Sequence, residues 1–389
     1  FWLKFHWSPS CIPADRTRTI VIVALDIHAL SSKLELDRML TLALVAFSAL
    51  PLAACKSLLQ NDVGRHSQGP PSVISLRVET IREMEHEGTP FTQGLEISKD
   101  GSHLIETSGA YPPGTPSYVR KVDPATGKTI EKQFGGLNNG EFAEGIVQLP
   151  DGTWYMSTYT DRVLLEYKPG LEFVQSHSFP YTGWGLTRSA DGSSFLSTDG
   201  SALIRELELR QPFSAISEKA LMCRGQKVSG LNELEMVDNF LGHGPRLLGN
   251  VYLTRVVLAI DPTTGHCTHV ANLEGVSEPL RSDEPSGFHA CNGLAYNRSS
   301  ETFFATGKNW QKMFEVRFVE DPSDQNKAVA KLDQFLHVHG SASMMQLSQI
   351  PRSMIHGLRS NFTTGGISKG GTFAKVARPL YRKLKDQKD

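Results

Sequence analysis

The feature that most constrains this chain is a pattern that is repeated five times in its middle. Each copy has a polar or aromatic residue, then Gly or Glu, then an aliphatic residue and a strand-like run that ends in a turn. The copies are FTQGLEISKDG from Phe91, FAEGIVQLPDG from Phe142, TGWGLTRSADG from Thr182, LNELEMVDN from Leu231 and CNGLAYNRSSE from Cys291. Their spacing of roughly 40 to 60 residues matches propeller blades and exceeds that of most solenoid repeats.

Short apolar runs such as WYMSTY, RVLLEYK, RVVLAID and TFFATGK lie between these copies, separated by turn-forming residues. Asp-Pro-x-Thr-Gly occurs at 123–127 and again at 261–265, as expected of hairpin turns in equivalent places of two blades. No long segment has helical periodicity, which disfavours α/β folds. We therefore predict an all-β fold, a five-bladed β-propeller with a central channel over residues 78–320, at about 50 residues a blade.

The segments on either side of the repeats have a different character. The first residue is Phe1 and not Met, so we interpret residues 1–38 as a non-native or mis-annotated extension. From Met39 the run MLTLALVAFSALPLAAC predicts a signal peptide over residues 39–54, followed by a polar linker over residues 55–77. Residues 321–389 lack the repeat, and residues 351–389 hold nine Lys or Arg against two Asp, so we expect a basic, flexible tail.

The signal peptide predicts a secreted protein or one in the secretory pathway. In the alternative, Leu52-Ala53-Ala54-Cys55 is a lipoprotein box, and a lipid on Cys55 would attach the protein to a membrane. The formal net charge of −1 gives no general attraction to nucleic acid, so we expect no nucleic-acid partner, and we expect a monomer.

Beyond Cys55 the cysteines are Cys223, Cys267 and Cys291, which allow at most one disulfide within the chain. Their pairing cannot be read from their positions. Asn297-Arg298-Ser299 and Asn361-Phe362-Thr363 are glycosylation sequons, so a glycoprotein is expected if the host is eukaryotic.

In a propeller the innermost strand of each blade lines the channel. The residues just before the Gly or Glu of each copy share one phase of that strand: Gln93, Glu144, Trp184, Asn232 and Asn292. A single Asn or Gln near a turn more often satisfies backbone groups. Recurrence at one phase instead indicates that these side chains converge on a confined space at one end of the channel.

Three other polar residues are secondary candidates. Glu233 and Glu235 share a strand with Asn232 and face the channel or the opposite side, depending on whether a bulge intervenes. Lys308 follows a strand-like run, and its ordinary interpretation is a solvated lysine in a turn.

Six ordered segments carry a more specific signal than the repeat alone. They are FTQGL from Phe91, FAEGI from Phe142, GWGLT from Gly183, LNELE from Leu231, NGLAY from Asn292 and TGK-x-W from Thr306. They resemble the signature segments of the plant and bacterial glutaminyl-peptide cyclotransferases, in the family's order and over residues 78–318.

The resemblance implies a five-bladed propeller whose active site lies at one mouth of the channel, without a cofactor or a catalytic metal. The implied reaction is an acyl transfer that converts the N-terminal glutamine of peptides or proteins into pyroglutamate and releases ammonia. Carried over by motif, Glu144 is the essential acid-base residue, and Asn232 and Lys308 are the other catalytic residues. The implied substrate-binding residues are Gln93, Phe91, Phe142, Trp184, Tyr159, Tyr252, Asn292 and Trp310.

This chemistry suits the residues. The nucleophile is the substrate's own α-amine, so no Ser or Cys nucleophile is needed, and the site must fold the glutaminyl side chain toward that amine. One carboxylate between amine and amide can move the proton, and an apolar surround of Phe142 and Trp184 would raise its pKa toward neutrality. An amide of Asn232 or Gln93 and the Lys308 ammonium could stabilise charge on the carbonyl oxygen.

The chain departs from the family pattern at four places. Tyr159 and Tyr252 stand where the family has Trp, Thr182 stands where it has Glu, and Ala143 stands where it has Gly. Because both tyrosines keep an aromatic surface, these changes affect the expected substrate range more than the chemistry.

Two alternatives of other classes stay open at this point. A calcium-dependent lactonase-like propeller would take oxygen ligands from Glu144, Asn232 and Asn292, although Lys308 would repel the cation. A non-catalytic propeller would serve as a binding module, with the basic tail recruiting a partner.

Overall fold

The computed structural model describes residues 72–110, 116–137, 140–276, 290–321, 329–330 and 332–334. The chain divides into two units, residues 1–68 and 69–389, and every described residue belongs to the second. The expected extension 1–38, the signal peptide 39–54 with Cys55, most of the linker 55–77, Asn361 and most of the tail 321–389 lie outside the described residues. Within the described ranges no helix is both long and apolar enough to cross a membrane.

The described part of the chain is built almost entirely of antiparallel β-sheet, so the predicted all-β class is confirmed. Three sheets have four strands, and each takes its strands in chain order. They comprise β2 (Thr92–Ile97), β3 (Leu104–Ser108), β4 (Tyr118–Val122) and β5 (Thr129–Gln133); β6 (Ala143–Gln148), β7 (Trp154–Thr158), β8 (Val163–Tyr167) and β9 (Phe173–Ser178); and β10 (Leu186–Arg188), β11 (Phe195–Ser197), β12 (Leu203–Leu207) and β13 (Ala215–Ala220).

A fourth sheet has eight strands and contains both the first and the last strand of the fold. Its order is β16 (Leu231–Val237), β17 (Arg246–Val251), β18 (Val256–Ile260), β19 (Cys267–Asn272), β1 (Ile74–Glu85), β22 (Lys312–Glu320), β21 (Thr302–Gly307) and β20 (Cys291–Asn297). A small hairpin of β14 (Met222–Cys223) and β15 (Gln226–Lys227) precedes it, and two 3₁₀ turns, η2 (Phe240–Gly242) and η3 (Leu273–Val276), follow β16 and β19.

Strand β1 closes this arrangement. It pairs antiparallel with β22, where Leu76 lies opposite Glu320, and parallel with β19, where Ile74 lies opposite His269. A strand from the start of the fold therefore completes the sheet formed by its end. Because β1 begins at Ile74, the packed domain starts before the predicted boundary at residue 78.

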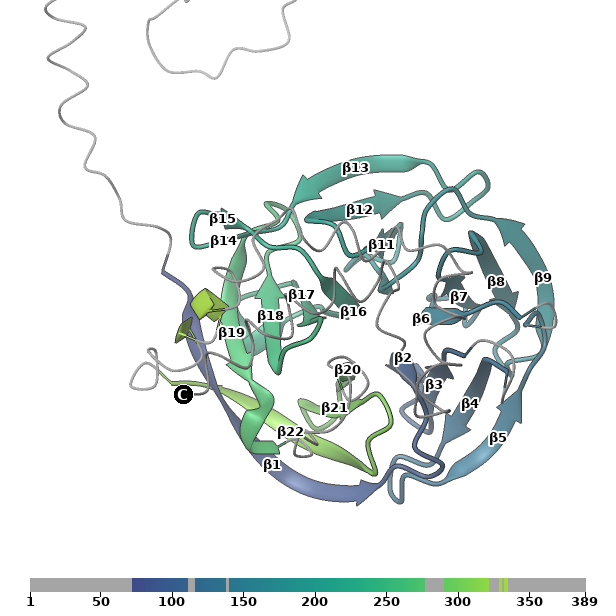
Figure 1. Ribbon diagram of the computed structural model, residues 1–389, viewed down its shortest axis with the longest axis horizontal. Helices are drawn as coiled ribbons and strands as arrows, with labels where there is room; N and C mark the ends of the chain where they lie inside the picture. The colour runs from purple at the N-terminus through teal and green to yellow at the C-terminus, as the bar shows by residue number, and fades with distance from the viewer. Residues whose placement is uncertain are drawn as a thin grey trace, which may run out of the picture. The chain divides into compact units, whose positions relative to one another are not determined.

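The sheets stand around a common centre (Figure 1). The four-stranded sheets have their first strands inward and their last strands at the rim, whereas the eight-stranded sheet has both of its end strands, β16 and β20, inward. The inner strands contact one another in the order β2, β6, β10, β16 and β20, and β20 contacts β2. Burial follows this order: all of β16 is buried, whereas most of the rim strand β9 is exposed.

Glycines let the inner strands approach this closely. A Cβ on Gly94 would lie 2.8 Å from the backbone nitrogen of Ile146, and one on Gly145 would lie 2.4 Å from that of Leu186. A Cβ on Gly185 would lie 2.0 Å from the carbonyl oxygen of Asn232. Real Cβ atoms do not come this close to backbone, so the repeated glycine of the sequence is a packing requirement.

The core lies between neighbouring sheets and not within one interior. Buried apolar side chains of the described residues form clusters at these interfaces; for example, Ile105 and Val119 of one sheet pack against Ile146 and Trp154 of the next. Burial of such side chains contributes about 1.5–3 kcal/mol each, which makes the interfaces the main source of stability.

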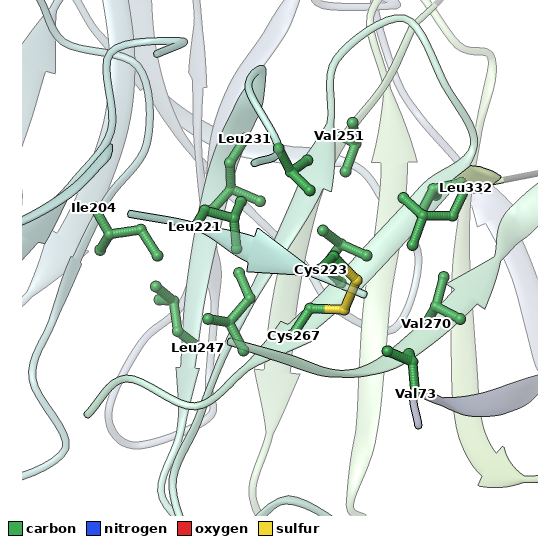
Figure 2. Close-up of a cluster of buried hydrophobic side chains, with 14 of the residues drawn as sticks. Val73, Ile204, Leu221, Cys223, Leu231, Leu247, Val251, Cys267, Val270 and Leu332 are labelled. Carbon is green, nitrogen blue, oxygen red and sulfur yellow. A yellow bond between two sulfur atoms is a disulfide. The ribbon is translucent and has the colours of Figure 1, made fainter. Parts of the chain in front are cut away.

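One cluster receives residues from both flanks of the ring. Figure 2 shows Val73, which precedes β1, and Leu332, which follows β22, beside the disulfide between Cys223 and Cys267. Arg224 also forms an ion pair with Asp333 at 2.7 Å. The packed part of the chain thus extends past the predicted boundary at residue 320 into the segment expected to be a tail.

The two Asp-Pro-x-Thr-Gly segments form equivalent turns, as predicted. One joins β4 to β5 and the other joins β18 to β19. In each turn the Asp carboxylate accepts a hydrogen bond from a backbone N–H two residues later, at 2.8 Å in both cases. Of the remaining features, Cys291 is a buried free thiol, and Asn297 of the first sequon is partly exposed at the end of β20.

We predict that Gly185→Ala lowers the free energy of unfolding by about 3 kcal/mol or more, because its Cβ would overlap the Asn232 carbonyl. Gly275→Ala is the matched control, since nothing lies within 4 Å of the added methyl. Urea unfolding of both variants measures the difference. Equal midpoints for the two variants would contradict the packing argument.

Candidate active site

The residues that precede the Gly or Glu of each copy are all buried. Gln93, Glu144, Asn232 and Asn292 lie on β2, β6, β16 and β20, and Trp184 lies two residues before the start of β10. Their positions on successive inner strands agree with the predicted shared phase. An irregularity at the Gly or Glu of the copy interrupts the register of β2, β6, β16 and β20 with their second strands.

Two of these amides contact each other. The Nδ2 of Asn292 donates to the backbone oxygens of Thr92 and Gln93 at 3.0 and 3.2 Å and to Oε1 of Gln93 at 3.3 Å. Asn292 therefore joins β20 to β2 by binding backbone carbonyl groups, as a single Asn near a turn usually does. The Oδ1 of Asn292 is buried without a hydrogen-bond partner among the described residues.

Five aromatic side chains form a belt next to these strands. Phe142, Tyr159 and Trp184 are buried together, with Phe91 and Tyr252 packed against them. Ring centroids are 6.3 Å apart for Phe91 and Phe142, 6.1 Å for Phe142 and Tyr159, and 5.4 Å for Trp184 and Tyr252. All three pairs meet edge to face, a geometry that favours aromatic contact.

Lys308 joins the two ends of this aromatic belt. Its Nζ lies 4.9 Å from the centre of the Phe91 ring and 5.2 Å from the centre of the Tyr252 ring. Backbone hydrogen bonds hold the turn that carries it: Lys308 N–H donates to Ala290, and Asn309 N–H donates to Pro90, which precedes Phe91. The side chain is 4% exposed, so it is not the solvated turn lysine of the ordinary interpretation.

Burial controls the ionisation of the two charged residues in this region. It raises the pKa of the Glu144 carboxyl well above its ordinary value; the Lys308 ammonium opposes this shift and the Asp161 carboxylate adds to it. Burial also lowers the pKa of Lys308 to about 8, against the opposing effect of Glu144. An acid and a base with pKa values moved toward neutrality are typical of a site that transfers protons.

Asn232 adds a polar group on the neighbouring inner strand β16. It is 3% exposed, and no donor in the described part of the chain reaches its Oδ1. An unsatisfied buried amide oxygen is costly and is often explained by a ligand. Asp161 has no counterpart among the predicted residues; it accepts a hydrogen bond from the Phe142 N–H at 2.8 Å, and the sequence motifs contain no sign of it.

Trp310 is the predicted site residue that the structure places elsewhere. It is 1% exposed and belongs to the core cluster between β16–β19 and β20–β22. Its ring packs edge to face on Phe314, and the Arg255 guanidinium lies 4.6 Å from its centre. Trp310 accounts for the glycine of the TGK-x-W motif. A Cβ on Gly307 would lie 2.3 Å from the Trp310 ring, so the two residues can pack together only when position 307 is glycine.

The secondary candidates Glu233 and Glu235 are both buried residues of β16. Glu233 stands at the position that the other copies give to glycine. Burial raises the pKa of its carboxyl well above the ordinary value, and the nearby backbone N–H groups of Leu95 and Leu294 oppose this shift. The Glu233 side chain therefore extends from β16 toward β2 and β20. Glu235 interacts electrostatically with Glu96 and Glu233, and burial raises its pKa well above the ordinary value.

The calcium alternative needs the side-chain oxygens of Glu144, Asn232 and Asn292. The Oδ1 atoms of Asn232 and Asn292 have no hydrogen-bond partner among the described residues, but the Glu144 carboxyl interacts with the Lys308 ammonium. A cation in that place would be repelled by Lys308.

The fold and this region together define a class of protein: an all-β ring of sheets that holds a buried carboxylate and a buried ammonium beside an aromatic belt. The family model for glutamine cyclotransferase matches residues 48–318, more than half of the chain. The chain therefore belongs to the glutamine cyclotransferase family, which places it among the cyclotransferase enzymes. This confirms the family that the six segments indicate.

Two individual proteins are similar to this chain. A glutaminyl-peptide cyclotransferase of Arabidopsis thaliana is 28% identical over 249 residues, which cover 62% of this chain and 71% of that protein. The crystal structure of Myxococcus xanthus glutaminyl cyclase matches with a TM-score of 0.55 at 24% identity, covering 64% of this chain and 99% of that one. The structural match supports the β-propeller type of fold.

We predict that Glu144→Gln removes a pH dependence of stability. A raised folded-state pKa means that the folded protein keeps a proton that the unfolded chain loses above its ordinary pKa of 4.5. The free energy of unfolding therefore falls as the pH rises through this window, by up to about 1.4 kcal/mol per pH unit. The variant lacks this fall, so its stability relative to the native chain increases from pH 5 to pH 8.

Urea unfolding at both pH values measures this difference. Glu172→Gln, at an exposed position, is the control and should track the native chain. A Glu144→Gln variant that also tracks the native chain would show that the carboxyl is not perturbed.

Proposed function

We propose that this chain cyclises the N-terminal glutamine of peptides or proteins to pyroglutamate and releases ammonia. The observation that carries the proposal is the buried pair of Glu144 and Lys308 beside the aromatic belt, in a chain of the glutamine cyclotransferase family. The two similar proteins, a glutaminyl-peptide cyclotransferase and a glutaminyl cyclase, agree with it.

The proposal includes a five-bladed propeller. The eight-stranded sheet can be divided at the β19–β1 pair into two groups of four strands, β16–β19 and β20–β22 with β1. Together with the three four-stranded sheets, this gives five groups. Five core clusters, one between each neighbouring pair of groups, support the same count.

In the proposed reaction the substrate supplies its own nucleophile. The α-amine nitrogen attacks the side-chain amide carbon, a C–N bond forms, and the bond from that carbon to the amide nitrogen then breaks. The Glu144 carboxylate takes a proton from the attacking amine and gives it to the departing nitrogen, which leaves as ammonia. Its raised pKa suits both transfers, because a carboxyl with an ordinary pKa is too weak a base for an amine.

The other residues act on charge and shape. The Lys308 ammonium stabilises the negative charge that develops on the carbonyl oxygen during attack. The amide of Asn232, with its unpartnered oxygen, fixes the reacting glutamine by hydrogen bonds. Phe91, Phe142 and Trp184 hold the side chain in its folded conformation and keep water away from the reacting atoms.

We predict that Glu144→Gln loses at least about a hundredfold in the rate of ammonia release from a glutaminyl dipeptide, because the proton carrier is gone. A coupled ammonia assay and mass spectrometry of the peptide measure it. The exposed variant Glu172→Gln should keep native turnover, and circular dichroism should show both variants folded. Native turnover in Glu144→Gln would remove Glu144 from the mechanism.

We predict that Lys308→Arg changes the alkaline side of the pH profile. With a pKa of about 8, Lys308 loses its charge above that pH, whereas an arginine keeps its charge throughout the assay range. The ratio of native to variant kcat/KM should therefore fall about tenfold per pH unit above pH 8. The ratio cancels the titration of the substrate amine, and a constant ratio would exclude Lys308 as the charged group.

We also propose a cellular compartment and an oligomeric state for this protein. We infer that residues 39–54 direct the protein to the secretory pathway, with attachment through a lipid on Cys55 as the alternative, and that the protein is a monomer. Mass spectrometry of the mature N-terminus distinguishes cleavage from lipidation, and light scattering measures the mass in solution.

A further inference from the structure

Outside the candidate active site, His243, His269 and Glu320 bring three metal-binding atoms together. One ligand atom from each lies within 4.8 Å of the other two, and no other such group of His, Cys, Asp and Glu occurs in the described ranges. Oε1 of Glu320 lies 2.6 Å from Nε2 of His243 and 3.2 Å from Nε2 of His269. The three residues come from the turn after η2, from β19 and from the end of β22.

The ring of His269 is fixed in orientation. It is 1% exposed and packs edge to face on Phe240 with a centroid distance of 5.4 Å. Oγ1 of Thr268 lies 2.8 Å from Nδ1 of His269 and 3.2 Å from the Ala259 carbonyl oxygen, so a hydrogen bond holds the second ring nitrogen. This hydrogen bond and the contact with Phe240 direct Nε2 of His269 at Glu320.

This arrangement places two atoms that can bind a metal, Nε2 of His269 and Oε1 of Glu320, 3.2 Å apart. A proton or a metal ion can bridge such a nitrogen and oxygen. A hydrogen bond from the second ring nitrogen to a nearby oxygen is also how proteins usually orient a metal-binding histidine. Arg246, a positive group that acts electrostatically on His269, donates to Oγ1 of Thr268 at 3.1 Å and to the Pro245 carbonyl at 2.7 Å.

A tight turn positions His243. Its N–H donates to the Phe240 carbonyl, the Phe240 N–H donates to the Gly244 carbonyl, and Asn239 Oδ1 accepts from the Gly244 N–H at 3.1 Å. The turn has positive φ at Leu241, Gly242 and Gly244. Because glycine adopts positive φ without steric cost, the two glycines allow this turn to form. The His243 side chain is 40% exposed, so its ring can still adjust.

The spacing fits a small divalent transition metal. Zinc binds His nitrogen at about 2.0–2.1 Å and carboxylate oxygen at about 2.0–2.2 Å, so tetrahedral ligands lie about 3.4 Å apart. The distance from His269 to Glu320 already approaches this value. His243 has to move away from Glu320 by less than about 1 Å and toward His269, since the three ligand atoms are spread over up to 4.8 Å. Both His243 and Glu320 are partly exposed, which leaves room for water as a fourth ligand.

We propose that His243, His269 and Glu320 form a binding site for a zinc-class divalent metal. The site lies where β1 enters between β19 and β22, on the outer part of the ring (Figure 1). Ile74 of β1 pairs with His269, and Leu76 pairs with Glu320. A metal here would bind both neighbours of the closing strand and so stabilise the ring at its seam, without contacting the aromatic belt.

Zinc titration of the untagged full chain, first freed of metal by dialysis against a chelator, tests the proposal. Binding is followed by competition with a zinc indicator and by the melting temperature, and Co²⁺ replaces zinc to give visible absorption from bound ligands. The native chain should bind zinc and melt at a higher temperature with it. His243→Ala and Glu320→Gln should each weaken the zinc Kd at least about tenfold and abolish the rise in melting temperature.

His177→Ala is the matched control, because His177 pairs with Glu166 at 2.6 Å in the same way but without a second histidine. It should bind zinc as the native chain does. All three changes lie outside the proposed active site, so retained ammonia release would report that each variant is folded. Equal zinc affinity in the native chain, His243→Ala and Glu320→Gln would overturn the proposal, as would native binding no tighter than millimolar.

Discussion

The close approach of the inner strands at the centre of the ring is the constraint on which the rest of this structure depends. Gly145 and Gly185 each face the backbone of the next inner strand at a distance that excludes a Cβ. The strands can therefore converge only where the side chain is absent. Convergence in turn brings the residues before these glycines, Glu144 and Trp184 among them, into one buried region, so that the packing requirement and the site share the same short segments.

Burial in this region determines the chemistry of the charged groups. Glu144 and Lys308 are both removed from water, which moves their pKa values toward each other and toward neutrality. The same burial makes the charged forms costly, so the site is less stable than an apolar core of the same shape would be. The edge-to-face contacts of the aromatic belt and the backbone bonds of the Lys308 turn hold this costly arrangement in place.

Much of the fold and part of the site could be predicted from the sequence, because every copy of the repeat contains the residues that its own inner strand and turn require. The inner strands, the all-β class and the Asp123 and Asp261 turns follow from patterns within a few residues. The motifs also marked Lys308, but its contacts with Phe91 and Tyr252 join residues far apart in the chain and depend on closure of the ring.

Features that depend on long-range packing left no sign in the sequence. The Asp161 carboxylate, in the turn after β7, acts electrostatically on Glu144. Trp310 packs in the core although it belongs to a site motif. Similarly, β1 begins before the first repeat, and Leu332 packs after the last one. In each case the decisive contact is with another sheet, whereas the sequence pattern describes only the strand itself.

The closing strand has a consequence for how this protein is made on the ribosome. β1 is synthesised first, but its partner β22 is among the last strands of the ring to emerge. Until then β1 has an unpaired edge next to apolar surface, a state that invites association with other chains. The nascent chain would therefore spend most of its synthesis with an open seam, and chaperones that bind extended apolar segments would be of most use during that interval.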